Sequence, residues 1–65
     1  MSDKDELYLT PDDLSRRWMM KIGTLAHWRS RGEGPRFLKL GGNVRYILSD
    51  VESYEAAQTR GGDAA

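Results

Sequence analysis

One stretch of the sequence constrains the fold more than any other: residues 22–31, IGTLAHWRSR, which Gly32 closes. Its apolar residues recur every three positions and predict a helix with one apolar stripe: Ile22, Leu25 and Trp28. On the 3.6-residue helical period the opposite side is small and polar: Gly23, His27 and Ser30, flanked by Thr24, Ala26 and Arg31. Gly32 suits the position after a helix because glycine adopts the left-handed conformation without steric cost. A short helix held by one stripe leaves its other side available to a partner.

A strong helix start precedes this stretch at Thr10–Asp13, TPDD. The segment offers a threonine cap, a proline for the first helical position, and two acidic residues for the positive end of the helix dipole. Leu9 before the cap and Leu14 after it are spaced for a hydrophobic staple. We therefore expect a first helix that runs to about Trp18.

Met19–Lys21 then forms a short turn between two helices, which is a helix-turn-helix arrangement. Met20 is expected to fill the corner of this turn from the core side. Many such turns carry glycine where Met19 lies and a serine or threonine cap where Lys21 lies. Since both are missing, the start of the second helix is weakly specified.

A β-hairpin is predicted by two segments with alternating apolar residues, Arg36–Leu40 and Val44–Leu48, which lie on either side of Gly41–Asn43. With Gly41–Asn43 as a three-residue loop, one face of the hairpin becomes the core face: Leu38, Leu40, Val44, Tyr46 and Leu48. The other face places Lys39 opposite Arg45, with Phe37 opposite Ile47. Like charges directly opposed destabilise a hairpin, which favours neutralising phosphates nearby. A two-residue loop gives a different pairing.

The sequence Ser49–Glu52, SDVE, matches a capping box and predicts a third helix from Asp50 to about Gln58. Near the amino terminus, Leu7–Leu9 suits either a short strand or a strap over the core. The order helix, turn, helix, hairpin, helix predicts an α+β winged helix-turn-helix domain over residues 7–59. Residues 1–6 are expected to be a flexible amino terminus, and residues 60–65 a flexible tail.

The composition excludes several classes of site. The 65 residues contain no cysteine and one histidine, which leaves no disulfide framework and no thiolate metal site, so we expect no metal and no cofactor. No nucleophile–base pair is visible, and Asp12 and Asp13 are adjacent on a helix, where side chains do not face each other. We therefore expect no enzyme. We also expect no membrane span and no signal peptide, because no apolar run is long enough for a span and the first residues are acidic.

The net charge of zero conceals a segregation of charge along the chain. Residues 16–45 hold eight basic residues against one acidic residue, a net charge of +7, whereas the remainder holds two against nine, a net charge of −7. A basic middle between acidic ends is typical of a surface that binds a polyanion, although mixed salt bridges on a solvated surface give the same composition. The segregation favours nucleic acid.

Three segments in this order and spacing resemble the excisionase-like, MerR-type winged-helix family, which includes phage excisionases and AlpA-type regulators: YLTPDDLSRRW, TLAHWRSRG and GPRFLKLGGNVRYILSDVESY. The resemblance covers about Tyr8 to Tyr54. It implies that the second helix lies in the major groove of double-stranded DNA and that the hairpin, or wing, touches the neighbouring backbone or minor groove.

Carried onto this chain, the resemblance gives a set of DNA-binding candidates in the helix-turn-helix, the second helix and the wing: Arg16, Arg17, Lys21, Gly23, Thr24, His27, Ser30, Arg31, Lys39, Gly42, Asn43 and Arg45. Relatives usually carry longer polar or basic side chains where Gly23 and His27 lie. Bidentate hydrogen bonding to guanine is then available from Arg31 or, less well, from Arg29. Arg29 lies near the apolar stripe, so the alternative expectation is that it folds back on an acidic residue of the first or third helix. Few direct contacts with base edges are therefore expected, and specificity is expected to come from DNA shape and from several protomers acting together.

The resemblance implies an excisionase: a cytoplasmic, DNA-associated factor of a bacterial host cell that binds attachment-site DNA cooperatively, bends it and directs a phage integrase toward excision. The oppositely charged segments favour head-to-tail self-association on DNA. The alternative is a small AlpA-type transcriptional regulator with the same contacts. A third hypothesis is a protein-binding adaptor whose winged helix has lost DNA.

Overall fold

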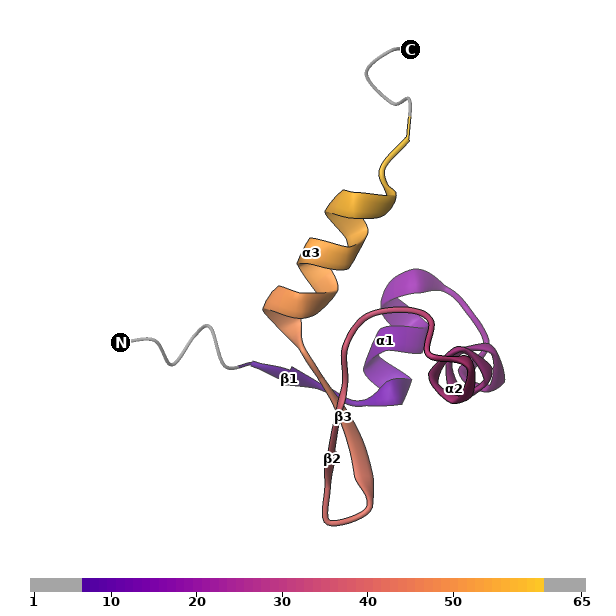
Figure 1. The fold of residues 1–65 in the computed structure, drawn as a ribbon, viewed down its shortest axis with the longest axis vertical. Coiled ribbons are helices and arrows are strands. Elements are labelled where there is room, and N and C mark those ends of the chain that lie inside the picture. The colour runs from indigo at the N-terminus through magenta and orange to yellow at the C-terminus, as the bar shows by residue number, and fades with distance from the viewer. Residues whose placement is uncertain (1–6, 61–65) are drawn as a thin grey trace.

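The computed structural model describes residues 7–60 and has an α+β fold with three helices and a three-stranded antiparallel sheet (Figure 1). The elements follow in the order β1 (Tyr8–Leu9), α1 (Pro11–Trp18), α2 (Ile22–Arg31), β2 (Leu38–Leu40), β3 (Asn43–Ile47) and α3 (Leu48–Gln58). The β2–β3 hairpin and α3 extend in opposite directions, with α1 and α2 to one side (Figure 1). The two terminal segments expected to be flexible lie outside the described residues, apart from Arg60.

Helix α1 begins as predicted. The Thr10 hydroxyl accepts a hydrogen bond from the Asp13 backbone N–H at 3.0 Å, and the Asp13 carboxylate accepts one from the Thr10 N–H at 2.9 Å. The hydrogen bonds from Thr10 lower the pKa of Asp13, and Arg16 lowers it further. Leu9 and Leu14, the two staple residues, belong to the same apolar cluster. Local sequence therefore determines this helix start.

The turn between α1 and α2 lacks the glycine and the side-chain cap that such turns often carry, as the sequence indicates. Met19 ends α1 in the left-handed conformation, with φ at 55°, and its side chain is 90% exposed. Met20 packs against the core, and its carbonyl accepts a hydrogen bond from the Ser15 hydroxyl. Lys21 caps α2 without a side-chain hydrogen bond. The predicted stripe of α2 is wrong at its first position, because Ile22 is 44% exposed and burial begins at Leu25.

The predicted hairpin register is wrong. The pairs are Leu38 with Arg45, Lys39 with Val44 and Leu40 with Asn43, so the loop holds two residues, Gly41 and Gly42. Both glycines have positive φ, at 59° and 86°, as a type I′ turn requires. Two consecutive glycines satisfy this turn without strain, and its twist matches that of the flanking strands.

This change of register moves the side chains of β2 to the opposite face of the sheet, because side chains alternate along a strand. The side chains of Val44 and Tyr46 in β3 lie on the core side, as predicted. Leu38 and Leu40, which were predicted to face the core, share a face with Arg45 and not with the buried Tyr46. Lys39 lies on the other face, opposite Val44. The two cations therefore do not oppose each other, and the argument from like-charge repulsion no longer applies.

Strand β3 occupies the centre of the sheet, between β1 and β2. The segment near the amino terminus is a strand, since Tyr8 pairs with Ile47 and Leu9 pairs with Tyr46. The Leu7 carbonyl continues this ladder by accepting a hydrogen bond from the Leu48 N–H at 2.9 Å. The β1 strand thus fastens the point where β3 becomes α3.

The predicted capping box of the third helix is also wrong. Helix α3 begins at Leu48, directly after β3, and its cap residue Ile47 makes no side-chain capping hydrogen bond. Ser49 consequently lies inside the first turn, where it cannot act as the cap. The sheet supplies the partner for the first helical N–H instead, through Leu7. The end of the helix at Gln58 agrees with the prediction.

Four side chains form the buried core of the described residues, one from each of α1, α2, β3 and α3: Leu14, Leu25, Tyr46 and Val51. Partly buried residues pack around them: Leu9, Trp18, Met20, Trp28 and Val44. Burial of a large apolar side chain contributes about 1.5–3 kcal/mol, so a core this small depends on every one of these contacts. It fixes α2 and the hairpin side by side on the body of the protein.

Candidate nucleic-acid interface

Helix α2 turns Leu25 into the core and leaves its opposite side exposed to solvent. The exposed side carries small or polar residues: Gly23, Ala26, His27 and Ser30. Thr24 is half-buried at its edge. A Cβ added at Gly23 would meet nothing within 4 Å, so the first turn of α2 is open to an approaching molecule.

A shallow groove of about 360 Å³ separates α2 from the hairpin. Residues from both elements line it: Ala26, Arg29, Ser30, Phe37, Lys39, Gly42 and Val44. The groove brings together three residues that the sequence selected as candidates, namely Ser30, Lys39 and Gly42. The exposed side of α2 and one face of the hairpin therefore form one continuous surface.

The hairpin presents its cations in two directions. Lys39 is exposed and lines the groove beside α2. Arg45 lies on the opposite face, half-buried, and donates a hydrogen bond to the Val44 carbonyl at 2.6 Å. Asn43 is exposed beside the turn. Because Lys39 and Arg45 face opposite ways, positive charge reaches both sides of the hairpin.

Arg29 is held inside the groove by aromatic side chains. Its guanidinium donates a hydrogen bond to the Tyr46 hydroxyl at 2.7 Å and lies 5.8 Å from the Phe37 ring centre and 6.0 Å from that of Tyr46. The expectation that Arg29 folds back was correct, but its partner is a tyrosine of β3 and not an acidic residue. No local pattern indicates this partner, since the two residues lie 17 positions apart in the sequence.

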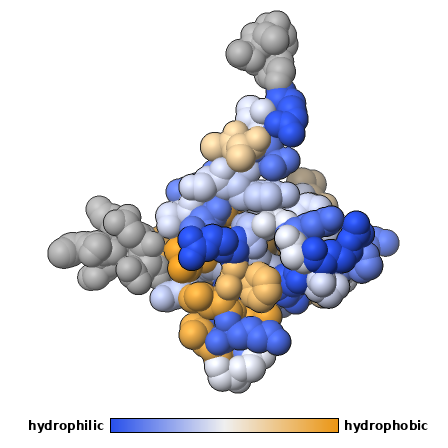
Figure 2. All heavy atoms as spheres, in the orientation of Figure 1, coloured by the Kyte–Doolittle hydropathy of each residue, from blue (hydrophilic) through white to orange (hydrophobic). Residues whose placement is uncertain are grey.

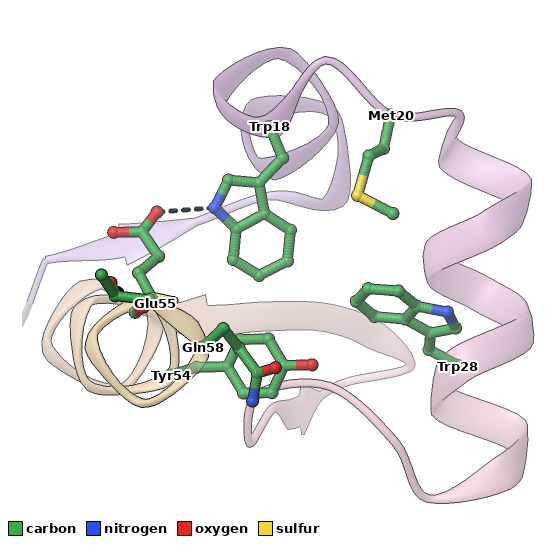
Figure 3. A pocket seen from close by; sticks show the side chains of 7 residues that line it. Trp18, Met20, Trp28, Tyr54, Glu55 and Gln58 are labelled. Carbon is green, nitrogen blue, oxygen red and sulfur yellow. Dashed lines mark hydrogen bonds between the residues drawn. The ribbon is translucent and has the colours of Figure 1, made fainter. Parts of the chain in front are cut away.

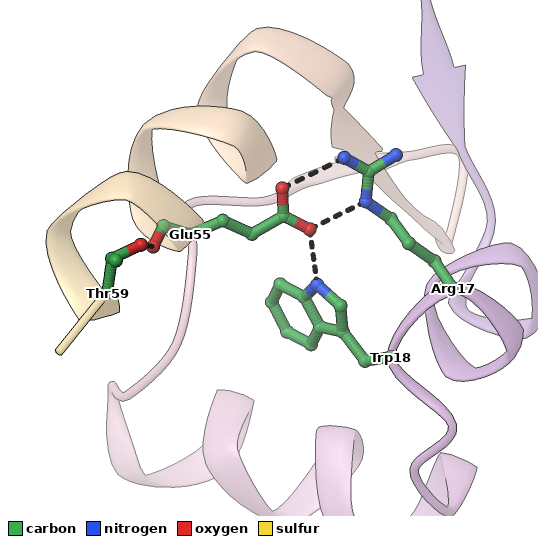
Figure 4. A network of polar contacts seen from close by, with 4 residues as sticks. All are labelled: Arg17, Trp18, Glu55 and Thr59. Carbon is green, nitrogen blue, oxygen red and sulfur yellow. Dashed lines mark hydrogen bonds and ion pairs between the residues drawn. The ribbon is translucent and has the colours of Figure 1, made fainter. Parts of the chain in front are cut away.

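The two candidate arginines of α1 are engaged with acidic residues. Arg16 pairs with Asp13 at 2.9 Å on the exposed side of the helix. Arg17 donates two hydrogen bonds to Glu55 of α3, at 2.6 and 2.9 Å, and Glu55 also accepts one from the Trp18 indole at 2.5 Å (Figure 4). Hydrogen bonds from Arg17 and Trp18 lower the pKa of Glu55 to about 2.

At the other end of α2, Arg31 lies 3.3 Å from the His27 ring and pairs with Glu33 at 3.2 Å. Both side chains of the Arg31–Glu33 pair are about half exposed, at 56% and 49%. Exposed pairs of this kind contribute little stability, so Arg31 can exchange Glu33 for another anion at small cost. Lys21 is exposed at the start of α2.

A second depression, of about 410 Å³, lies between α1, α2 and α3, away from the hairpin (Figure 3). Three aromatic rings border it, with centres 5.7–6.4 Å apart: Trp18, Trp28 and Tyr54. The prediction that both tryptophans contribute to the core is confirmed, since each packs against the buried cluster. Each also leaves part of its surface at this depression, which the sequence did not indicate.

None of the helices in residues 7–60 combines the length and the hydropathy that a membrane span requires. Within the same residues, no three histidine, cysteine, aspartate or glutamate side chains gather as a metal site would need. Comparisons of this chain with family models, with curated proteins and with solved structures give no match.

Proposed function

We propose that the chain is a winged helix-turn-helix DNA-binding protein, in which α2 enters the major groove and the β2–β3 hairpin is the wing. The observation that carries this proposal is the groove shared by Ser30 of α2 and Lys39 of the hairpin. A major groove about 12 Å wide admits a helix, and the adjacent backbone or minor groove is then within reach of a hairpin beside that helix.

The charges around this surface support the proposal. No acidic side chain within residues 7–60 forms an ion pair with Lys21, Lys39 or Arg45. Lys21 lies at the start of α2, where unpaired backbone N–H groups and the helix dipole favour an anion such as a phosphate. Arg17 differs from these residues because Glu55 already neutralises it, so we assign it to the link between helices and not to the DNA contacts.

The short side chains on α2 favour a protein that reads DNA shape more than base sequence. Gly23, Ala26 and Ser30 reach little of a base edge, and Arg29 is held by Tyr46. Arg31 is the remaining arginine of α2 for guanine recognition. These features fit an excisionase that bends attachment-site DNA, binds it cooperatively through head-to-tail contacts, and directs a phage integrase toward excision.

A small AlpA-type transcriptional regulator is the alternative function, and it would use the same surface at a promoter. A protein-binding adaptor would use the surface without DNA. The three proposals differ in their DNA targets: repeated direct sites for the excisionase, a promoter site for the regulator, and none for the adaptor.

The experiment that tests the proposal is a gel-shift titration at several salt concentrations. One probe is the attachment-site DNA beside the resident integrase gene, a second is a promoter fragment, and a scrambled duplex of equal length is the control. Stepwise cooperative shifts with bending on the first probe are the expected result. Single-step binding to the promoter alone would favour the regulator, and absence of binding to every duplex at low salt would refute the DNA-binding function.

A further inference from the structure

The tip of the hairpin is narrow and stands clear of the rest of the protein. A Cβ added at Gly41 or Gly42 would meet nothing within 4 Å. Leu40, the last residue of β2, pairs directly with Asn43 across this turn, and its side chain is 51% exposed. A large apolar side chain therefore lies directly beside the open turn, opposite a carboxamide.

Apolar surface gathers over the hairpin, with a hydrophilic residue among it (Figure 2). By the register, Leu38, Leu40 and Arg45 share one face of the hairpin, and Lys39 lies on the other face. Leu40 thus has one cation, Arg45, on its own face of the hairpin and another, Lys39, on the opposite face. An exposed leucine alone needs no explanation, but one placed at a tip between cations on both faces has the chemistry of a nucleic-acid wedge.

The minor groove of DNA matches this arrangement. It is about 6 Å wide and is bounded by a phosphate backbone on each side. Its floor presents base acceptors that a carboxamide N–H can bind. Proteins that bend DNA through the minor groove frequently insert an apolar side chain between two base pairs, which unstacks them and bends the duplex toward the major groove.

We propose that Leu40 is such a wedge: it enters the minor groove and separates two stacked base pairs, while Lys39 and Arg45 each contact one of the two flanking backbones. Asn43 donates to an acceptor on the groove floor. The inference rests on the proposed DNA-binding function and assigns the bending to one side chain. The step chosen by Leu40 is a pyrimidine–purine step, because such steps unstack most easily.

The test uses the full chain and a duplex selected by that chain from a random-sequence library, so the target need not be known. Permanganate oxidises unstacked thymines and reports the wedge directly, while energy transfer between dyes at the duplex ends reports the bend. The wild-type protein is expected to make the thymines of one base-pair step reactive and to shorten the end-to-end distance. Leu40→Ala is expected to remove most of both signals with an affinity loss of about tenfold or less, because the phosphate contacts remain.

Two variants serve as controls. Leu40→Met keeps an apolar side chain of similar reach and is expected to retain both signals. Leu7→Ala removes a leucine of nearly equal exposure, 52%, that lies beside β1 and away from the tip, and it is expected to change neither signal. Circular dichroism melts of all variants verify that the fold is intact.

The outcomes separate the wedge from the function on which it rests. If the library yields no bound duplex at low salt, the DNA-binding function fails and the wedge fails with it. If the wild type binds but Leu40→Ala leaves the reactive thymines and the bend unchanged, only the wedge is refuted. Unchanged DNA signals together with lost self-association of Leu40→Ala in sedimentation would assign Leu40 to a protein contact instead.

Discussion

Arg17 of α1 and Glu55 of α3 form a bidentate pair across 38 positions of sequence, and the Trp18 indole N–H completes the set of donors to the same carboxylate. The pair links α1 to α3 (Figure 4). It also removes one arginine from the positive charge available to a ligand.

The Arg17–Glu55 pair predicts a specific loss of stability in acid. The folded-state pKa of Glu55 is about 2 and its ordinary value is 4.5, so the unfolded chain binds a proton more readily. Stabilisation is therefore fully present above pH 4.5 and is lost as pH falls toward 2. Because the carboxylate is one-third exposed, we expect a loss of about 1 kcal/mol. Urea unfolding of wild type and Glu55→Gln should converge at low pH; parallel curves would contradict the prediction.

Met19→Gly should stabilise the protein. Met19 has a left-handed backbone conformation, which costs a residue with a Cβ about 1–2 kcal/mol, and its exposed side chain contributes little packing. Glycine also raises the conformational entropy of the unfolded chain, which offsets part of this gain. We therefore expect the free energy of unfolding to increase by about 0.5–1 kcal/mol. Thermal unfolding measures it, with Ala26→Gly in the regular α2 helix as a control that should lower stability.

Lys21→Ser should raise stability while weakening DNA binding. Lys21 caps α2 without a side-chain hydrogen bond, and serine would supply one, worth about 1 kcal/mol. The same change removes a cation proposed to face a phosphate, so the slope of log affinity against log salt should fall by about one unit. Denaturation and salt-dependent binding measure the two effects separately. An unchanged salt slope would exclude Lys21 from the contact surface.

Arg45→Ala should affect DNA binding and not stability, whereas Arg17→Ala should affect stability and not the salt dependence of binding. Arg45 lies on the hairpin with no ion-pair partner in the described residues, so its loss should weaken binding to all sequences and lower the salt slope by about one unit, with the fold intact. Arg17 is neutralised by Glu55, so its loss should lower stability and leave the slope unchanged. Unfolding by Arg45→Ala would refute the placement of the hairpin cations.

Gly34→Ala should destabilise the protein more than Gly42→Ala. The two glycines have nearly equal φ, 85° and 86°, so alanine meets the strain of a positive φ at both positions. At Gly34 the new Cβ would also lie 2.9 Å from Cε3 of Trp28, whereas at Gly42 it meets nothing within 4 Å. The difference in unfolding free energy isolates the clash, which we expect to cost about 1–3 kcal/mol. Equal losses would mean that Trp28 moves aside freely.

The sequence predicted best what depends on neighbouring residues. The start of α1 follows from a cap, a proline and an acidic residue within four positions, and the end of α2 follows from Gly32. The hairpin register failed because Gly41–Asn43 fits a loop of two residues as well as one of three, and a change of one residue reverses the faces of β2 while Val44 and Tyr46 of β3 keep theirs. The cap at Ser49 failed because the partner of the Leu48 N–H lies far away in sequence, at Leu7.

The candidate site followed the same rule. The exposed side of α2 was predictable from helical periodicity, and its position next to a hairpin was expected from the order of the elements and from the family resemblance. The engagement of Arg17 with Glu55 and of Arg29 with Tyr46 was not, because each contact joins residues that only the folded chain brings together. Charge composition counts these arginines as available, whereas the fold has already paired them.

The direct passage from β3 into α3 has a mechanical consequence. No residue separates Ile47 from Leu48, and the hydrogen bond to Leu7 clamps the junction. The hairpin tip and the far end of α3 thus belong to one continuous stretch of backbone, which β1 holds near its middle. Because no linker separates β3 from α3, any rotation of the hairpin relative to α3 has to strain the hydrogen bond between Leu48 and Leu7.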